Sequence, residues 1–274
     1  MADEPILHAD IALARRLEGA EAASNVAAAE AHARRHPGSG ATWLAVAGGH
    51  AMFVGVGSPI TQAFGVGMNG PVGEDEMDRL EDFFRSRGSG VYLEVCPLAD
   101  ASLLEHLGKR GYRVMEFSNV SVRPLAGYSP APMEGLGFHV LPARADEEAV
   151  YARTAIEGFF GSEALAGMED LFGGFFEAGK GTAFIAWEDE KPIGAAAMMV
   201  HGEIVLCFGD ATPGAFRGRG VQSALIAARL AAGVATGCSL GMAVTLPGTI
   251  SQRNYERHDF RVAFTRAKFA RAWQ

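Results

Sequence analysis

The chain has 274 residues, of which 49% are hydrophobic, 20% charged and 9% aromatic. These are ordinary values for a globular protein, and they exclude a disordered, collagenous or fibrous chain. No apolar run reaches the roughly 18 residues that a membrane span needs, and the acidic first ten residues lack the apolar core of a secretory signal. We therefore expect a cytoplasmic protein of two domains with no membrane partner.

The formal net charge of −8 argues against nucleic acid as a partner. The charge is unevenly distributed, because residues 215–274 hold nine basic and two acidic side chains, a local balance of +7. This segment is either a site for a phosphorylated cofactor or a solvated surface. The three cysteines, Cys96, Cys207 and Cys238, are widely spaced and lack a Cys-x-x-Cys pair, so we expect neither a disulfide framework nor a metal site.

In chain order, hydrophobic periodicity first predicts a long helix over residues 6–33. The next elements are strands over 43–47, 51–55 and 61–66, a helix over 74–87, a strand over 91–95, a helix over 101–110 and a strand over 112–123. Residues 125–137 are rich in proline and glycine, which sustain neither helix nor strand. We therefore divide the chain into a domain over 1–125, a linker over 126–137 and a domain over 138–274.

The second domain begins with a strand over 138–141 and a helix over 146–160, with Asp146 as its N-cap. The later elements are a helix over 162–177, strands over 182–187, 193–200 and 203–211, a helix over 218–235, a strand over 242–246, a helix over 249–257 and a strand over 260–269. This order predicts an α+β fold around a mixed sheet. The first half repeats the order in weaker form, which indicates an internal duplication.

The strongest local signal is the segment Phe-Arg-Gly-Arg-Gly-Val-Gln-Ser at 216–223, between a predicted strand and a predicted helix. Its glycines let backbone amides approach a ligand closely, and the start of a helix adds a partial positive charge. The segment is neither a Walker loop nor a dinucleotide fingerprint. It indicates an anion-binding loop, or else a turn that only leads the chain into its helix.

A second glycine cluster, residues 65–70, satisfies the Gly-x-Gly-x-x-Gly pattern after a predicted strand. Pro71 and Gly73 follow at once, so no helix begins on the third glycine, as a dinucleotide site requires. We interpret the cluster as a loop in the position that 217–222 takes in the second half. A nicotinamide-dependent enzyme that uses this cluster is a minor alternative, and NADH binding would favour it.

The run from Asp210 to Ser223 resembles the acyl-CoA pyrophosphate loop of the GCN5-related N-acetyltransferases, the GNAT superfamily. The pattern of that family is Gln/Arg-x-x-Gly-x-Gly/Ala. Arg217 and Gly220 match its first and fourth positions, whereas Gln222 departs from its sixth.

A later segment, residues 251–260, looks like the part of the family in which an Asn and then a Tyr precede a Gly-Phe pair, with Asp259 in place of the glycine. The resemblance covers residues 138–269 and includes the order of the strands. It implies two GNAT-like domains, each a mixed and mostly antiparallel sheet flanked by helices. The second is complete, and the first is a degenerate repeat without a cofactor loop.

The resemblance also implies acetyl-CoA as the donor. Loop amides would hold its pyrophosphate, and the end of the strand before the loop would offer backbone groups to the pantetheine and the acetyl carbonyl. The cofactor-binding residues implied in this way are Ala211, Thr212, Arg217, Gly218, Arg219, Gly220, Val221, Gln222, Ser223 and Asn254.

For catalysis, the resemblance implies that Tyr255 protonates the departing thiolate, since phenol and thiol differ by only about 1.5 pKa units. A structural alternative for Tyr255 is an aromatic at the edge of the core. We predict Asp210 as the base that takes the proton of the acceptor amine, with a turn residue as its structural alternative. A water chain, or one of four other side chains, could also do this work: Glu157, Glu163, His201 and Glu203.

We expect direct transfer of the acetyl group to a primary amine of a small molecule or peptide, because no Gly-x-Ser-x-Gly motif supports a covalent intermediate. By resemblance, residues 155–177 would form the acceptor wall. Its phenylalanines line an apolar pocket or belong to the core: Phe159, Phe160, Phe172, Phe175 and Phe176. The alternative function is a non-catalytic acyl-CoA sensor or interaction module, and an oligomer is compatible with either.

Overall fold

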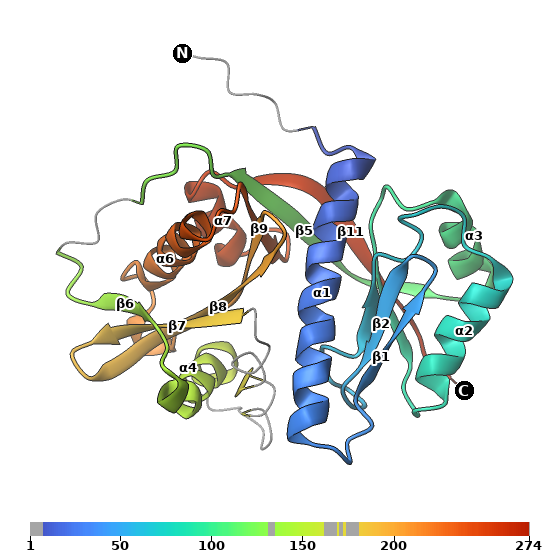
Figure 1. The fold of residues 1–274 in the computed structure, drawn as a ribbon, viewed down its shortest axis with the longest axis horizontal. Coiled ribbons are helices and arrows are strands. Elements are labelled where there is room, and N and C mark those ends of the chain that lie inside the picture. The colour runs from blue at the N-terminus through green and yellow to red at the C-terminus, as the bar shows by residue number, and fades with distance from the viewer. Residues whose placement is uncertain (1–7, 131–134, 162–168, 170–171, 174–180, 274) are drawn as a thin grey trace. The chain divides into compact units, whose positions relative to one another are not determined.

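The computed structural model describes residues 8–130, 135–161, 169, 172–173 and 181–273 (Figure 1). Contacts divide the chain into two compact units. The first comprises Met1–Ser121, Thr245–Pro247 and Arg261–Gln274, and the second comprises Val122–Val244 and Gly248–Phe260. Both units combine helices with a mixed sheet, so the predicted α+β class is confirmed.

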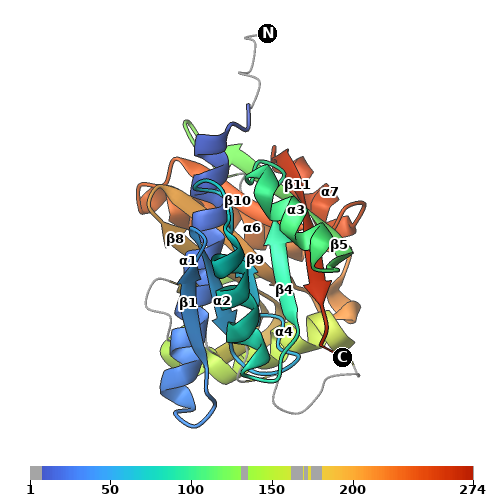
Figure 2. The same ribbon diagram turned by 90° about the vertical axis from the view of Figure 1, so that its right-hand side faces the viewer.

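The first unit contains α1 (Ile11–Arg35), β1 (Thr42–Val46), β2 (Gly49–Phe53), β3 (Gln62–Phe64), α2 (Glu74–Arg85), β4 (Val91–Val95), α3 (Ala101–Lys109), most of β5 (Arg113–Pro124) and β11 (Arg261–Arg271). Strands β1, β2 and β3 are antiparallel neighbours, β4 runs parallel to β3, and β11 is antiparallel to β4. Figure 2 shows α2 and α3 on the side of these strands that faces the viewer.

The second unit contains β6 (His139–Pro142), α4 (Glu148–Phe160), β7 (Gly181–Glu188), β8 (Lys191–His201), β9 (Ile204–Ala211), α6 (Val221–Ala235), β10 (Leu240–Thr245) and α7 (Ile250–Arg257). Its strand order is β10-β9-β8-β7-β6. The β9–β10 pair is parallel and the other pairs are antiparallel. The predicted hairpin between β7 and β8 is present, with Glu188 opposite Lys191.

The two units repeat one pattern of strand pairing. In the first, two antiparallel pairs (β1–β2 and β2–β3) precede a parallel pair (β3–β4), and α2 connects the parallel strands. In the second, the pairs β7–β8 and β8–β9 precede the parallel pair β9–β10, which α6 connects. This repetition is what an internal duplication predicts.

Helices cover both faces of the sheet in the second unit. Phe184 and Ala196 pack in the same apolar cluster as Leu225 of α6, whereas Ile185 and Ala197 pack in a separate cluster with Tyr151 of α4. Neighbouring residues of a strand point to opposite faces, so α6 and α4 lie on opposite sides of β7 and β8 (Figure 1).

Two details differ from the sequence predictions. The last strand, β11, pairs with β4 and lies in the first unit, although the predicted domain over 138–274 includes it. The strand with which a segment pairs leaves no mark on that segment's local periodicity. Asp146 is not an N-cap, because a 3-10 turn (Ala145–Glu147) precedes α4 and the Asp146 carboxylate accepts a hydrogen bond from Arg144 instead.

The predicted helix over 162–177 lies mainly outside the described residues. Of its phenylalanines, Phe175 and Phe176 are not described, whereas Phe172 is buried. Within the described part of the chain, no helix is both long and apolar enough to cross a membrane.

Candidate functional site

Strands β9 and β10 pair over only part of their length. Their parallel register runs from Ile204 opposite Leu240 to Cys207 opposite Ala243, and β9 goes on to Ala211. In this last part the register with β8 also shifts. Gly209 has a φ of 68°, in the left-handed region that favours glycine. The irregularity turns the end of β9 out of the regular ladder, just before the glycine loop.

The glycine loop directly precedes α6, and its residues are exposed. Gly218 and Gly220 have φ values of 78° and 82°, and residues 217–220 are exposed. The N-cap residue of α6 is Gly220, which has no side chain to accept hydrogen bonds from the first turn. The first-turn amides of this helix, which begins at Val221, are therefore open to a ligand. Exposed amides at a helix N-terminus suit an anion such as a pyrophosphate, so the predicted loop residues fit that group.

Two close approaches fix the position of this loop. A Cβ added to Gly158 of α4 would lie 2.7 Å from the Thr212 nitrogen, so α4 touches the end of β9. A Cβ added to Gly194 of β8 would overlap the side chain of Val221 at the start of α6. Glycine at both positions lets α4 and α6 meet the strands where β9 ends.

The two loop arginines have protein partners. Arg217 donates hydrogen bonds to the carbonyls of Thr212 at 3.0 Å and Gly158 at 2.8 Å, which ties the loop to α4. Arg219 forms an ion pair with Glu188, and this hydrogen-bonded pairing lowers the pKa of the Glu188 carboxyl. Their contact with a pyrophosphate stays a prediction.

A buried ion pair lies beneath the end of β9. Arg229 of α6 is fully buried and binds both carboxylate oxygens of Asp210. It also donates to the carbonyls of Ala197 and Phe208, each at 3.1 Å. Burial lowers the pKa of Arg229, but Asp210 more than compensates, so the guanidinium stays charged.

Tyr255 of α7 completes this cluster. Its phenol donates a hydrogen bond of 2.6 Å to Asp210 and accepts one of 3.3 Å from Arg229. Its ring packs edge-on against Phe260, with centroids 4.9 Å apart. Burial raises the pKa of Tyr255 well above its usual value despite the opposing effect of Arg229, so the phenol keeps its proton. The structure thus brings together the two predicted catalytic residues, Tyr255 and Asp210.

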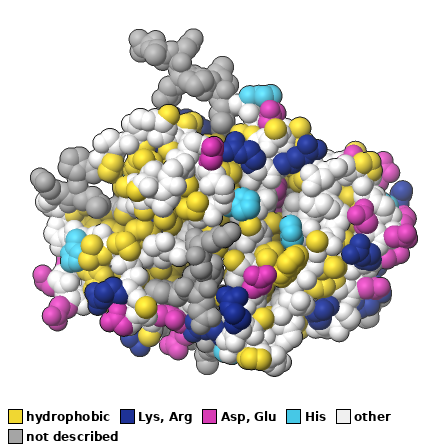
Figure 3. Space-filling model, in the orientation of Figure 1, with side chains coloured by type: hydrophobic (Ala, Val, Ile, Leu, Met, Phe, Trp, Pro, Cys, Tyr) yellow, Lys and Arg dark blue, Asp and Glu magenta, His cyan; other side chains and the backbone are white. Residues whose placement is uncertain are grey.

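Sequence reasoning missed Arg229 as part of the site. In the sequence, Arg229 is one of the nine basic side chains of residues 215–274, a segment that indicates either a cofactor site or a solvated surface. The available signal was spacing, since Val221, Leu225 and Arg229 follow one another at intervals of four and share a helix face. Arg266, from the same segment, is also buried. On the face that Figure 3 draws, basic and acidic side chains are interspersed rather than separated.

Gln222, the departure from the family pattern, joins α6 to α7. Its carbonyl oxygen accepts a hydrogen bond of 2.7 Å from Asn254, and its amide donates to Ser251 at 3.0 Å. The predicted pantetheine ligand Asn254 is therefore adjacent to the loop and already bonded to one of its residues. Its contact with a cofactor stays a prediction.

A second polar pair links the same two helices. The Ser223 hydroxyl lies 2.6 Å from the Nε2 atom of His258. Burial lowers the pKa of His258, and Arg123 lowers it further, so the imidazole is neutral near pH 7. No feature of the sequence singled out this pair.

The other candidate bases are differently placed. His201 and Glu203 lie at the turn between β8 and β9, whereas Asp210 lies at the opposite end of β9. Seven residues of strand separate Glu203 from Asp210 by about 23 Å at ~3.3 Å per residue. Glu157 is exposed and precedes Gly158, next to the end of β9. Glu163 lies outside the described residues.

The end of α4 supplies exposed aromatic surface. Phe159 and Phe160 are exposed, and the Phe159 ring stacks on Phe172 with centroids 5.8 Å apart. Two exposed phenylalanines beside Gly158 offer apolar surface near the loop. A role in acceptor binding stays a prediction for this segment.

The cluster over 65–70 is a loop, as expected, and α2 begins at Glu74 rather than on Gly70. Over the described ranges, the structure has no group of three or more His, Cys, Asp or Glu side chains that could hold a metal ion.

Comparisons with known proteins agree with this geometry. Residues 150–260 match the family described as the acetyltransferase (GNAT) family. No curated protein matches the chain.

Among solved structures, a GCN5-related N-acetyltransferase from Kribbella flavida is similar with a TM-score of 0.65 and 14% identity, over 90% of this chain and 96% of that one. A tandem GNAT protein from the clavulanic acid biosynthesis pathway gives 0.59 and 11%, over 81% and 78%. A GCN5-related N-acetyltransferase from Sphaerobacter thermophilus gives 0.53 and 16%, over 67% and 59%. These likenesses support the predicted arrangement of two domains, and residues 150–260 belong to the acetyltransferase (GNAT) family.

Proposed function

We propose that the protein is an acetyl-CoA-dependent N-acetyltransferase whose active site lies in the second unit. The observation that carries the proposal is the exposed glycine loop at the start of α6, directly beside the end of β9 where β9 and β10 part. The family match over 150–260 supports acyl transfer from acyl-CoA. The choice of acetyl over longer acyl groups is part of the proposal.

On the donor side, the amides of residues 218–223 bind the pyrophosphate, and the helix N-terminus adds favourable electrostatics. Arg217 holds the loop against α4 through its bonds to Thr212 and Gly158. Arg219 is exposed and can exchange Glu188 for a phosphate, because an exposed ion pair is weak. The backbone at Ala211 and Thr212 meets the pantetheine arm, and Asn254 contacts it from α7.

The proposed chemistry transfers the acetyl group directly from sulfur to nitrogen. The amine forms a bond to the carbonyl carbon, the bond from that carbon to sulfur breaks, and the thiolate takes the phenol proton of Tyr255. The amine gives its proton to Asp210, directly or through water. The 2.6 Å bond between the two residues then returns that proton from Asp210 to the Tyr255 phenolate.

The acceptor is a primary amine of a small molecule or peptide. Phe159 and Phe160 at the end of α4 form one wall of its site, because they are exposed and lie next to Gly158, which touches the end of β9. Apolar walls with a few polar groups are typical of small-molecule sites.

Calorimetric titration with acetyl-CoA tests the donor site before any acceptor is known, with CoA and NADH as comparisons. We expect one site per chain and weaker binding in the double variant Arg217→Ala/Arg219→Ala. The control is Arg79→Ala/Arg87→Ala, which removes two positive charges from the first unit. Equal affinity in both double variants would overturn the donor site.

Release of the CoA thiol in the presence of a panel of amines then tests transfer. Release of CoA that depends on the amine supports acetyltransferase activity. Comparison of the affinities for acyl-CoAs of different chain length then defines the preferred donor. Saturable binding with no release over a broad panel would contradict transfer and favour a non-catalytic acyl-CoA sensor.

A further inference from the structure

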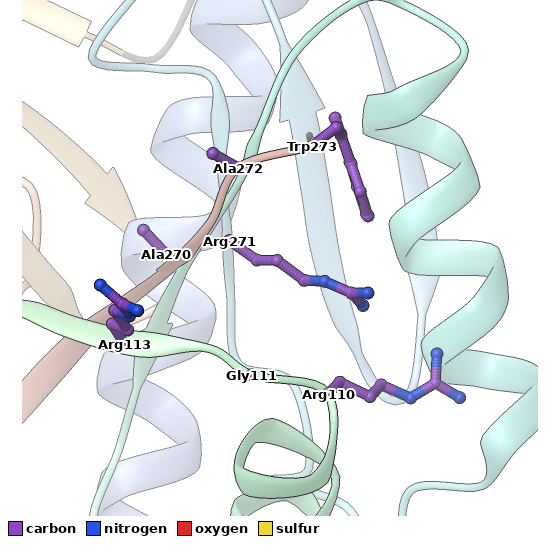
Figure 4. Close-up of a pocket in the computed structure, with 7 residues that line it drawn as sticks. All are labelled: Arg110, Gly111, Arg113, Ala270, Arg271, Ala272 and Trp273. Atoms are coloured by element: carbon purple, nitrogen blue, oxygen red, sulfur yellow. The ribbon is translucent and has the colours of Figure 1, made fainter.

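A hollow in the first unit lies outside the glycine loop and the catalytic cluster. It has a volume of about 540 Å³ and is lined by Arg110, Gly111, Arg113, Ala270, Arg271, Ala272 and Trp273 (Figure 4). Small-molecule sites have volumes of about 300 to 1,000 Å³, so the hollow is large enough for a ligand. The charged side chains among these lining residues are three arginines.

Two of the arginines are held by one buried carboxylate. Glu81 of α2 has a side chain that is only 5% exposed. One of its oxygens accepts a hydrogen bond of 2.6 Å from Arg271, and the other lies 3.3 Å from Arg110. Arg110 also pairs with Glu74 and Asp78. These anchors fix both guanidinium groups before any ligand arrives, which lowers the entropic cost of binding.

The anchors leave donors available. A guanidinium carries five N–H donors in a planar fork, and Arg271 uses one of them on Glu81. The planar fork matches the oxygens of a phosphate and binds them in pairs. Arg271 is also partly exposed, with 29% of its side chain accessible, so its remaining donors can reach a molecule in the hollow.

Arg113 supplies a positive charge with no internal compensation. It is exposed at the start of β5, and within the described residues it has no ion-pair or hydrogen-bond partner. It gives the lining a third cation, and Figure 4 shows its side chain directed away from those of Arg271 and Arg110. This arrangement favours an anion with more than one charge, such as a phosphate monoester, which carries −1.5 to −2 near pH 7.

Trp273 adds a flat aromatic wall. Its indole nitrogen donates to the Ser89 carbonyl at 2.7 Å, and the guanidinium of Arg85 lies 4.1 Å from its ring centroid. The guanidinium of Arg271 lies 5.0 Å from the same ring, and Figure 4 shows this arginine between Trp273 and Arg110. The ring and Arg271 therefore face one space, where a planar group can stack while an attached phosphate meets the Arg271 guanidinium.

We propose that this hollow binds a small molecule that carries both a phosphate monoester and a planar ring, of the chemical class of the nucleoside monophosphates. Arg113 and Arg271 bind the phosphate, and the indole of Trp273 stacks with the ring. The site is separate from the donor site of the second unit, and its existence does not depend on the proposed acetyltransferase activity.

Calorimetry on the full chain with three probes tests the proposal: AMP, adenosine and inorganic phosphate. AMP carries both features, and each of the other probes carries one. We expect saturable AMP binding, at least tenfold weaker binding of either partial probe, and a loss of AMP affinity on raising the salt concentration. Absence of AMP binding below about 1 mM, or equal affinity for all three probes, would overturn the proposal.

Three variants locate the AMP that binds. Arg113→Ala should weaken AMP binding by about tenfold or more, since this exposed side chain has no structural partner to lose. The matched control Arg79→Ala removes an exposed arginine of the same unit that does not line the hollow, and it should leave affinity unchanged. If Arg219→Ala in the second unit abolishes AMP binding and Arg113→Ala does not, the AMP binds at the glycine loop and the proposal is wrong.

Trp273→Leu separates stacking from charge. We expect it to weaken AMP binding and to leave the weak binding of phosphate unchanged. Circular dichroism and the melting temperature check that the variant is folded. Unchanged AMP affinity in folded Trp273→Leu would remove the ring from the site and overturn the stated ligand class.

Discussion

The phenol of Tyr255 donates a hydrogen bond of 2.6 Å to the carboxylate of Asp210, which Arg229 also holds from beneath. The two residues are 45 positions apart in the chain, on α7 and at the end of β9. A proton donor and a proton acceptor are therefore hydrogen-bonded to each other next to the glycine loop.

Replacing Arg229 by Met should strongly destabilise the protein. The change removes the partner of the buried Asp210 carboxylate and leaves the carbonyls of Ala197 and Phe208 without their donor. Loss of one partner of a buried ion pair costs about 3–5 kcal/mol. Chemical denaturation measures this free energy of unfolding.

The control for that change is Arg253→Ala, which removes an exposed arginine of α7. Its effect should stay below about 0.5 kcal/mol. The double variant Arg229→Met/Asp210→Asn should be less destabilised than the sum of the two single variants, because it leaves no unpaired charge. Additive effects would show that the two side chains do not interact energetically.

Tyr255→Phe should lower the turnover number by about 100-fold or more and leave the Kd for acetyl-CoA unchanged. The variant keeps the packing of the ring against Phe260 and loses only the hydroxyl. Steady-state kinetics and calorimetry measure the two quantities. Unchanged turnover would make Tyr255 a structural residue.

The same variant reports on the phenol in alkaline solution. Burial raises the pKa of Tyr255 above its ordinary value of about 10. The neutral phenol therefore contributes stability that is fully present below about pH 10 and is lost as pH rises through the higher folded-state pKa. Relative to Tyr255→Phe, the wild-type protein should lose stability only above pH 10, and an earlier loss would contradict the burial of an uncharged phenol.

Most helices and strands of both units were predicted from the sequence, because the hydrophobic periodicity of a segment indicates its secondary structure. The strand over 91–95 has the predicted bounds, and α7 begins after Thr249, whose side chain caps it. Each of these elements depends on neighbouring residues, which a single sequence contains.

The pairing of residues that lie far apart in the chain could not be predicted from the sequence. Nothing near residues 261–271 indicates that this strand pairs with β4, about 170 residues earlier, because many strands could provide the same edge. Arg229 is a similar case, since arginines are rarely buried unless paired, and its partner Asp210 is defined only by the irregular end of β9. The candidate site was therefore predicted as a set of residues, and its connections came from the fold.

Glu18 of α1 makes the stability of the first unit depend on pH near neutrality. Burial raises its pKa to about 7, although the nearby Arg266 opposes the shift. A raised folded-state pKa contributes stability that is fully present below the unfolded value of about 4.5 and is lost as pH rises through about 7. The wild-type protein should therefore lose stability between pH 5 and pH 7.5, and Glu18→Gln should not. The melting temperature of Glu18→Gln minus that of the wild-type protein should increase over this range.

The control for this effect is Glu30→Gln, since Glu30 lies on the same helix and is exposed. It should shift the melting temperature by the same small amount at each pH. A parallel pH dependence for wild type and Glu18→Gln would mean that Glu18 does not titrate in this range.

Gly194→Ala should both destabilise the second unit and weaken acetyl-CoA binding. The added Cβ would overlap the side chain of Val221 and lie 3.2 Å from Cδ1 of Leu225, so the start of α6 must move away from β8. Overpacking of this kind costs about 1–3 kcal/mol, and the displaced helix start carries the amides proposed to bind the pyrophosphate.

Gly214→Ala is the matched control, because a Cβ there would meet nothing within 4 Å. Val221→Ala should restore acetyl-CoA affinity to Gly194→Ala by making room for the new methyl group. Failure of this rescue, with stability restored, would show that the position of α6 does not govern donor binding.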